Sequence, residues 1–484
     1  MFIGKSHELT RRTFLRRSAQ VAGAGTASAY ALGLAGLADA AAFTAGNDYK
    51  ALVCVFLRGG NDHNNTLVPY DSTNHARYVS ARGGEFSNGG IAISRSQLTA
   101  TALGLPQGQV LTNDIQYALA PTMPKLKALY DSGAMAPLLN VGPLLAPTTR
   151  QQYDNRSVPI PPKLFSHNDQ QSTWQSYGTE GATLGSGGRI GDLAMTSNTN
   201  SIFTCISATS DPLFLAGDRA LTYRVSSTGA VPIDAVVGGR LYRSEAASAA
   251  LRSLLTQPSA HYLEADLTTI TKRSIETQAF VNTALSGVNL ATSFAPASGT
   301  NRLAEQLEIV ARLIAARQAL GVKRQVFMVS MGGFDNHDDL ASTHLGLLSQ
   351  LDFAMDAFYR ATAELGIADS VTSFTASDFG RTLTSNGDGS DHGWGAHHFI
   401  MGGAVAGGRF YGTAPAVSVD TPDQVGRGRL LPAVSVDQYM ATLGKWFGVA
   451  DSELRLIAPN LGRFATPDLG FMRAPVTSGL KLTA

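Results

Sequence analysis

The sequence predicts an α/β fold, in which helices cover both faces of a wide, mostly parallel sheet, with a helical insertion. Several short apolar runs are continuous rather than alternating, as expected of parallel strands that are buried on both faces. Longer stretches with helical periodicity separate these runs, which is typical of layered α/β folds. With 484 residues, of which 44% are apolar and 15% charged, the chain is long enough for a large core.

Four apolar runs predict the main strands: residues 51–57 (ALVCVFL), 136–141 (APLLNV), 326–331 (VFMVSM) and 371–375 (VTSFT). Three stretches predict helices that pack on the sheet: residues 121–130, 302–320 and 340–365. In the second of these, Leu303, Leu307, Val310 and Ile314 share one stripe, and Gly321 follows as a stop signal. Strands and helices therefore alternate, as in a doubly wound sheet.

We expect one α/β domain over residues 48–470. Residues 207–300 are rich in Ser, Thr and Ala, with helical patches near 241–255 and 270–285, and they predict an insertion packed on the main sheet.

The N-terminus carries a targeting pattern. Residues 10–15 read TRRTFL, and a weakly apolar run rich in Ala and Gly follows over residues 21–37. A paired arginine before such a run is typical of a twin-arginine signal peptide, here residues 1–42. It predicts export by the twin-arginine translocase and a periplasmic or secreted location. An ordinary secretory signal or a retained anchor helix is the alternative, and no later segment predicts a stable membrane anchor.

Charge and cysteine content exclude some classes. The formal net charge is +1, so nothing attracts nucleic acid by bulk charge. Cys54 lies inside an apolar run, where we expect a buried free thiol. A disulfide with Cys205 stays open, because an oxidising compartment permits one.

Three predicted strands lead directly into turns that carry aspartate. The turns are residues 58–62 (RGGND), 332–337 (GGFDNH) and 378–381 (DFGR). Ligands of open α/β sheets bind outside the carboxyl ends of the strands, so we expect these turns to converge. Their carboxylates would repel one another unless a cation or an arginine compensates the charge.

Histidines lie in the same kind of polar turn, and together with aspartates they are the usual ligands of divalent metals. The sequence predicts a site for Zn, Mn, Ca or Mg, and its candidate ligands are Asp62, Asp335, His337, Asp378 and His392. Simpler roles remain open: Asp62 could cap a helix, and Asp378 could pair with Arg381 or Arg58.

Five ordered motifs carry a resemblance: residues 57–62, Ser166-His167 with Trp174, residues 332–337, residues 377–381, and residues 391–393 (DHG). Over residues 48–470 the chain resembles a bacterial family of unknown function that is exported by the twin-arginine route. That family is usually grouped with the alkaline phosphatase and sulfatase superfamily. The resemblance implies a broad, mostly parallel sheet and metal-dependent hydrolysis or transfer of phosphate or sulfate esters.

The resemblance also implies roles for single residues. Asp62 matches the metal ligand after the first strand, Ser166 stands near the position of a nucleophile, and His392 matches the last histidine ligand. Asp335 with His337 and then Asp378 match the ligands between them. The chain departs from the pattern because Asp335 and His337 are two residues apart, not four, and because Phe379, not histidine, follows Asp378. A single metal, a calcium-type site or no hydrolysis at all stay open.

These observations predict an exported metal-dependent hydrolase that acts on a small anionic ester or a polymer. Ser166 is the candidate nucleophile, His167 the candidate acid/base, and Arg58 or Arg381 the clamp on the anionic oxygens. The alternative is a non-catalytic exported binding or assembly protein with a degenerate site. A serine esterase is less favoured because no Gly-x-Ser-x-Gly turn is present, and no phosphate-binding loop indicates a nucleotide.

Overall fold

A computed structural model describes residues 43, 48–210, 212–259 and 261–474. The predicted signal peptide, residues 1–42, lies outside the described residues. Within them, no helix is both long and apolar enough to cross a membrane.

The described chain forms one large sheet with the strand order β13-β4-β12-β9-β1-β8-β5-β6-β7, with β14 paired to β4. Its strands are β1 (Lys50–Leu57), β4 (Met135–Gly142), β5 (Cys205–Ser207), β6 (Thr222–Ser226), β7 (Gly229–Ala230), β8 (Arg324–Met331), β9 (Val371–Ser377), β12 (Ala396–Met401), β13 (Tyr411–Gly412) and β14 (Val434–Ser435). At the centre, β1 is parallel to both β8 and β9, whereas β12 is antiparallel to β9 and β4. The predicted α/β class and its four main strands are confirmed.

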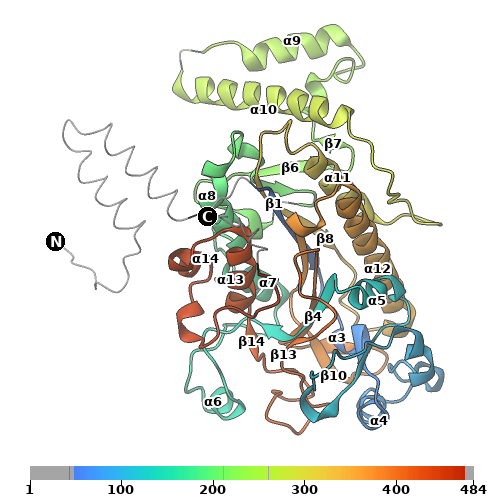
Figure 1. The fold of residues 1–484 in the computed structure, drawn as a ribbon. Coiled ribbons are helices and arrows are strands. Elements are labelled where there is room, and N and C mark those ends of the chain that lie inside the picture. The colour runs from blue at the N-terminus through green and yellow to red at the C-terminus, as the bar shows by residue number, and fades with distance from the viewer. Residues whose placement is uncertain (1–42, 44–47, 211, 260, 475–484) are drawn as a thin grey trace, which may run out of the picture.

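Helices cover both faces of the sheet (Figure 1). On one face lie α5 (Pro124–Asp131), α11 (Arg302–Ala315) and α12 (Leu340–Glu364); on the other lie α7 (His167–Ser176), α8 (Ser186–Ala194), α13 (Val436–Phe447) and α14 (Leu454–Ile457). Smaller elements line the lower end in the view: α3 (His63–Thr66), β2 (Leu67–Pro69), α4 (Ser72–Ala81), β3 (Tyr117–Leu119), α6 (Arg150–Asn155), β10 (Arg381–Ser385) and β11 (Ser390–His392).

Side-chain alternation along β1 shows why two helical layers are needed. Val53 and Val55 belong to the core cluster under α11 and α12, whereas Leu52, Cys54 and Phe56 belong to the cluster under α8 and α13. All five are buried, and each large apolar side chain contributes about 1.5–3 kcal/mol when it leaves water. Cys54 is a buried free thiol, as expected, and so is Cys205.

The segment predicted as an insertion, residues 207–300, contributes both strands and helices. It contributes β6 and β7 to one edge of the sheet and then forms α9 (Glu245–Thr256) and α10 (Tyr262–Ser286). These two helices lie side by side outside the two layers, at the top of Figure 1.

Candidate metal site

The ends of the central strands bring the three aspartate turns together, as the sequence predicts. In the parallel register, Leu57 at the end of β1 pairs with Met331 of β8 and with Ser377 of β9. The turns therefore leave the sheet side by side. Gly59 has a φ of 110°, and a Cβ atom there would lie 2.5 Å from the backbone nitrogen of Asp335, so only glycine permits this close approach.

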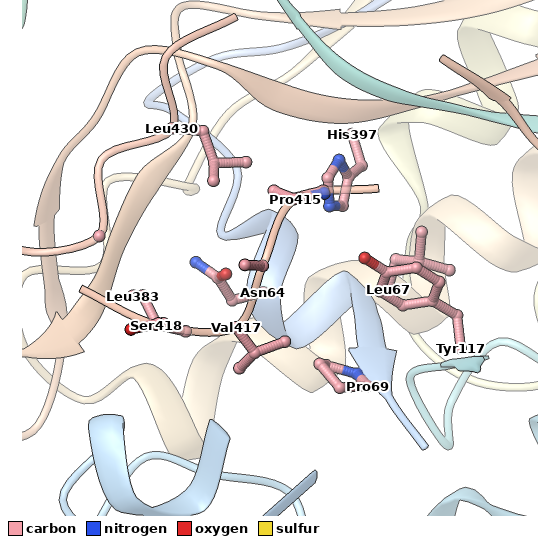
Figure 2. A pocket seen from close by; sticks show the side chains of 12 residues that line it. Asn64, Leu67, Pro69, Tyr117, Leu383, His397, Pro415, Val417, Ser418 and Leu430 are labelled. Carbon is pink, nitrogen blue, oxygen red and sulfur yellow. The ribbon is translucent and has the colours of Figure 1, made fainter. Parts of the chain in front are cut away.

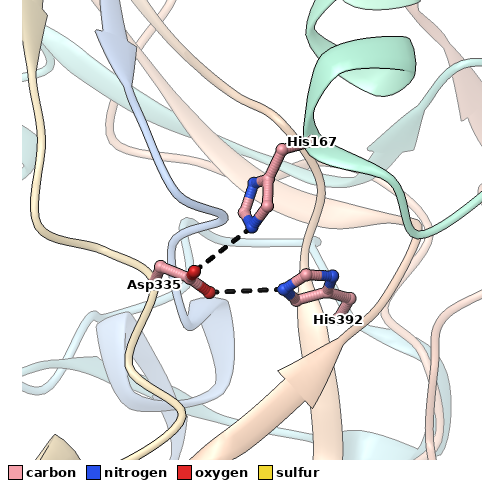
Figure 3. Close-up of side chains that lie close together, drawn as sticks. All are labelled: His167, Asp335 and His392. Atoms are coloured by element: carbon pink, nitrogen blue, oxygen red, sulfur yellow. Dashed lines mark hydrogen bonds and ion pairs between the residues drawn. The ribbon is translucent and has the colours of Figure 1, made fainter.

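Three side chains from separate segments converge at this edge. Figure 3 shows His167, from the start of α7, and His392, from β11, directed at the carboxylate of Asp335. Nε2 of His167 lies 3.3 Å from Oδ2 of Asp335, and Nε2 of His392 lies 3.3 Å from Oδ1. With one ligand atom taken from each residue, these atoms lie within 4.8 Å of one another, and a tetrahedral ion held at about 2.1 Å would bring them to about 3.4 Å through small side-chain movements.

The hydrogen bonding of His392 leaves a lone pair directed at Asp335. Nδ1 of His392 lies 2.7 Å from the backbone oxygen of Phe165, which can only accept, so Nδ1 carries the proton. Burial lowers the pKa of His392 and favours the neutral ring. Nε2 of a neutral ring in this tautomer is an acceptor, and it faces another acceptor, Oδ1 of Asp335.

His167 has a similar arrangement, with Asp378 behind it. Its Nδ1 donates to Oδ2 of Asp378 at 2.6 Å, and this hydrogen bond raises the pKa of His167. Asp378 is fully buried, and the same Oδ2 also accepts from Nε2 of Gln171 (2.8 Å) and from the backbone nitrogen of Gly59 (3.2 Å). Such a carboxylate behind a ligating histidine fixes the ring and its tautomer in metal sites.

Arg381 holds Asp335 in place. Its guanidinium pairs with Oδ1 of Asp335 and also donates to the backbone oxygens of Gly59, Gly60 and Ser390. Burial would raise the pKa of Asp335, but Arg381 and the neighbouring histidines outweigh burial and lower it. Because Arg381 is fully buried and its donors are used by the turns, its placement differs from the predicted anion clamp.

His337 lies at the rim of the group, with 39% of its side chain exposed. Its Nε2 is 2.8 Å from Nε2 of His392 and 3.1 Å from Oδ1 of Asp335. Its Nδ1 faces Asp391 at 3.5 Å, and Asp391 pairs with Arg427. His337 therefore adjoins the three convergent residues and is placed either to add a fourth ligand or to hold a proton beside them.

The residues fit a divalent cation. Nε2 of His167 and Oδ1 of Asp378 are buried polar atoms that find no hydrogen-bond partner within the described chain. Nε2 of the neutral His392 and Oδ1 of Asp335 are both acceptors, and their contact is unfavourable unless a proton or a cation lies between them. Two imidazoles and one carboxylate suit zinc, manganese or iron, whereas calcium and magnesium prefer oxygen ligands alone.

Asp62 does not join this group, which corrects its predicted role as a ligand. Its Oδ1 accepts from the backbone nitrogens of Asn64 and Asn65 as the N-cap of α3, and its Oδ2 accepts from Arg82 and Ser390, each at 2.7 Å. These four donors use the lone pairs of the carboxylate. The simpler interpretation of Asp62 as a helix cap describes its position.

The other predicted catalytic residues lie beside the group. Ser166 is the N-cap residue of α7, and its hydroxyl donates to Asp169 at 2.9 Å, not to His167. Arg58 lies 3.4 Å from the hydroxyl of Ser210 and lines a hollow of about 300 Å³ together with Gln171. Because Gln171 also contacts Asp378, this hollow adjoins the candidate metal site.

A second hollow, lined by Asn64, Tyr117, His397 and Val417, is shown in Figure 2. Its volume is about 20 Å³, which is room for roughly one water molecule and not for a substrate.

Sequence reasoning missed some contributors. Gln171 was detectable in principle, because it follows His167 by four residues on one helix and therefore shares its face. Arg82 and the backbone oxygen of Phe165 carry no such signal, because only tertiary folding brings them to Asp62 and His392.

Solved structures show only remote similarity. A crystal structure of Ps i-CgsB in complex with k-i-k-neocarrahexaose is 11% identical, covering 87% of this chain and 78% of that chain, with a TM-score of 0.34. The lipoteichoic acid synthase LtaP from Listeria monocytogenes is 10% identical (83% and 72% covered, TM-score 0.31). The C-terminal periplasmic domain of EcEptC from Escherichia coli is 9% identical (86% and 88% covered, TM-score 0.33). These values are too low to indicate an activity.

No curated protein matches the sequence. A family model does match, over residues 49–459, and this range contains every residue of the candidate site. The chain belongs to the DUF1501 family, which is described as a protein of unknown function.

Proposed function

We propose that this protein is an exported hydrolase of phosphate or sulfate esters that uses one divalent cation held by His167, Asp335 and His392. The observation that carries the proposal is the pairing of two imidazole nitrogens with the two oxygens of one carboxylate. Each imidazole is fixed from behind by an acceptor on its other nitrogen. A cation bound there supplies Lewis acidity, which polarises an ester oxygen and lowers the pKa of a nucleophilic water.

The remaining side chains have separate tasks. Asp378 keeps His167 in the tautomer that leaves Nε2 available, and Arg381 keeps Asp335 at the end of the sheet. Arg58, at the border of the 300 Å³ hollow, is the side chain best placed to bind the anionic oxygens of the ester. His337, at the rim, is placed to hold or give a proton at Nε2.

The test is metal content together with hydrolysis. We expect about one zinc, manganese or iron ion per chain in protein purified after native export. His167→Ala and His392→Ala should lose both the ion and the hydrolysis of p-nitrophenyl phosphate, bis-p-nitrophenyl phosphate or p-nitrophenyl sulfate. His261→Ala, an exposed histidine before α10, is the matched control. Protein without metal and without any of these activities would refute the proposal.

One observation favours the alternative of a non-catalytic binding or assembly protein. Arg381 already neutralises Asp335, so the charge of this carboxylate is compensated within the chain. Thermal unfolding with and without a chelator distinguishes a metal-dependent hydrolase from a non-catalytic protein. A metal enzyme should lose stability when chelated, because an ion that binds only the folded state stabilises it, whereas a protein without a metal should not change.

Export by the twin-arginine route is part of the proposal and rests on the pattern in residues 1–42. Replacing Arg11 and Arg12 together with lysine should leave the protein in the cytoplasm, as shown by fractionation. Export of that variant at the normal level would contradict this route.

A further inference from the structure

We infer that the hollow beside the metal site binds the alcohol part of the substrate, and that this part is a small, hydroxyl-rich group without negative charge, such as a polyol or a single sugar unit. That the bound group is part of an ester rests on the proposed function. The binding of the alcohol itself does not need the cation.

One wall of the hollow is a polar stripe on α7. Asn168, Gln171, Ser172 and Gln175 line it, and their spacing of three, one and three residues places them on one side of the helix. A stripe of amides and a hydroxyl is unusual on a helix that packs against a sheet, because amides are costly to bury without partners.

Two of these amides are fixed in complementary orientations. Oε1 of Gln175 accepts from the backbone nitrogen of Phe214 at 2.9 Å, so its amino group is left to donate. Nε2 of Gln171 donates to Asp378 at 2.8 Å, so its oxygen is left to accept. Within the described residues, neither of the remaining atoms makes a further hydrogen bond to the protein. A hydroxyl both donates and accepts, so a group with several hydroxyls matches this pair.

The rest of the lining narrows the class of ligand. Among the described lining residues, Arg58 faces the anionic end of the ester, and the exposed carboxylate of Glu180 disfavours an anionic alcohol. Among the described residues that line it, none is aromatic, so these residues offer an aromatic ring or a nucleobase no stacking surface. The apolar side chains of the described lining are Pro212 and Leu213, too few to favour a lipid chain.

The size of the hollow agrees with a single unit. Its volume is about 300 Å³, the lower limit of common ligand pockets. Arg58 belongs to this hollow and follows β1, directly before Gly59, whose backbone nitrogen donates to Asp378. An ester bound with its alcohol in the hollow would therefore present its anionic end to Arg58 and the metal site.

The test is binding of methyl α-D-glucopyranoside, glycerol and benzyl alcohol, measured by saturation-transfer NMR on the purified protein before and after chelation. We expect the glucoside or glycerol to bind in both states and benzyl alcohol not to bind. Gln175→Glu keeps the acceptor for Phe214 and removes the donors, so it should weaken binding by about tenfold. Asn168→Ala changes an exposed side chain and should weaken binding without affecting the fold.

The outcomes separate the two proposals. Hydroxyl-rich ligands that bind to a protein without metal or hydrolysis would support the hollow and refute the proposed function. Hydrolysis with a preference for benzyl esters, or binding that neither variant weakens, would overturn the inference and leave the proposed function standing. In an active enzyme, Gln175→Glu should raise KM for a sugar phosphate and leave kcat nearly unchanged, which a structural role would not produce.

Discussion

The turns that carry Asp62 and Asp335 leave neighbouring strands at the same edge of the sheet, and each contains a Gly-Gly pair. Asp62 is fully buried and accepts four hydrogen bonds, two from backbone nitrogens and two from Arg82 and Ser390. Asp335 is half exposed and faces the ring nitrogens of His167 and His392. Similar local sequences thus give a structural carboxylate in one turn and a candidate ligand in the other. Asp62 accepts from four donors of the chain, whereas Asp335 combines one donor, Arg381, with two histidine nitrogens that are available as ligands.

The largest effect should come from removing the charge of Asp335. Asp335→Asn should abolish metal binding and lower hydrolysis by about 10³-fold, because the Lewis acidity of the ion is worth several kcal/mol. Stability should fall less than in a variant that removes the side chain, because asparagine keeps an acceptor for the buried Arg381 and 47% of the side chain of Asp335 is exposed. Metal analysis, ester hydrolysis and urea unfolding check this, with the exposed neighbour Asp338→Asn as the control. Full activity in Asp335→Asn would mean that Asp335, like Asp62, is not a ligand.

Asp62→Ala should show the opposite pattern. It leaves the buried guanidinium of Arg82 without its carboxylate partner and removes the cap of α3, so we expect a loss of about 3–5 kcal/mol in the free energy of unfolding. Urea unfolding measures the loss. Asp62→Asn keeps an acceptor at the cap and should lose less. The folded fraction should retain its metal; loss of metal at unchanged stability would return Asp62 to the ligand set.

The sequence was sufficient for the strands and their common edge, but not for this distinction. Residues 51–57 and 326–331 are continuous apolar runs, so both β1 and β8 were predictable, and their parallel register brings the turns together. Whether a carboxylate finds donors depends on residues far along the chain. Arg82 is 20 positions from Asp62, and Ser390 is 328 positions away. The sequence predicts His167 as a candidate acid/base. Its role as a metal ligand depends on the hydrogen bond from its Nδ1 to Asp378, which only the fold brings about.

A smaller effect should come from the residue that holds Asp378. Gln171→Met removes the donor to Oδ2 of Asp378 but keeps the length of the side chain. Residues behind a ligating histidine typically change metal affinity by about 10–100-fold, and we expect a loss in that range. Competition with a chelator of known affinity measures it, with the exposed Gln257→Met as the control. An unchanged affinity would show that Asp378 is held well enough by Gly59 and His167 alone.

A pH-dependent effect should come from His63, which follows Asp62 in the structural turn. Its Nδ1 accepts from the backbone nitrogen of Arg381 at 3.3 Å, and burial lowers the pKa of His63 to about 4. The folded state therefore keeps the ring neutral, whereas the unfolded state binds a proton below about pH 6.5. The contribution to stability is complete above that pH and is lost as the pH falls from 6.5 towards 4, by up to about 1.4 kcal/mol per pH unit.

His63→Gln removes this titration and keeps an acceptor for Arg381, so its free energy of unfolding should depend less steeply on pH in that range. Urea unfolding at pH 7, 6 and 5 tests the difference, and His261→Gln, an exposed histidine, should leave the slope unchanged. The metal-site histidines add their own dependence through the ion, so the comparison should be made on chelated protein. A slope that does not change in His63→Gln would mean that the ring takes up its proton without unfolding, and that the turn around Asp62 is less rigid than its four hydrogen bonds indicate.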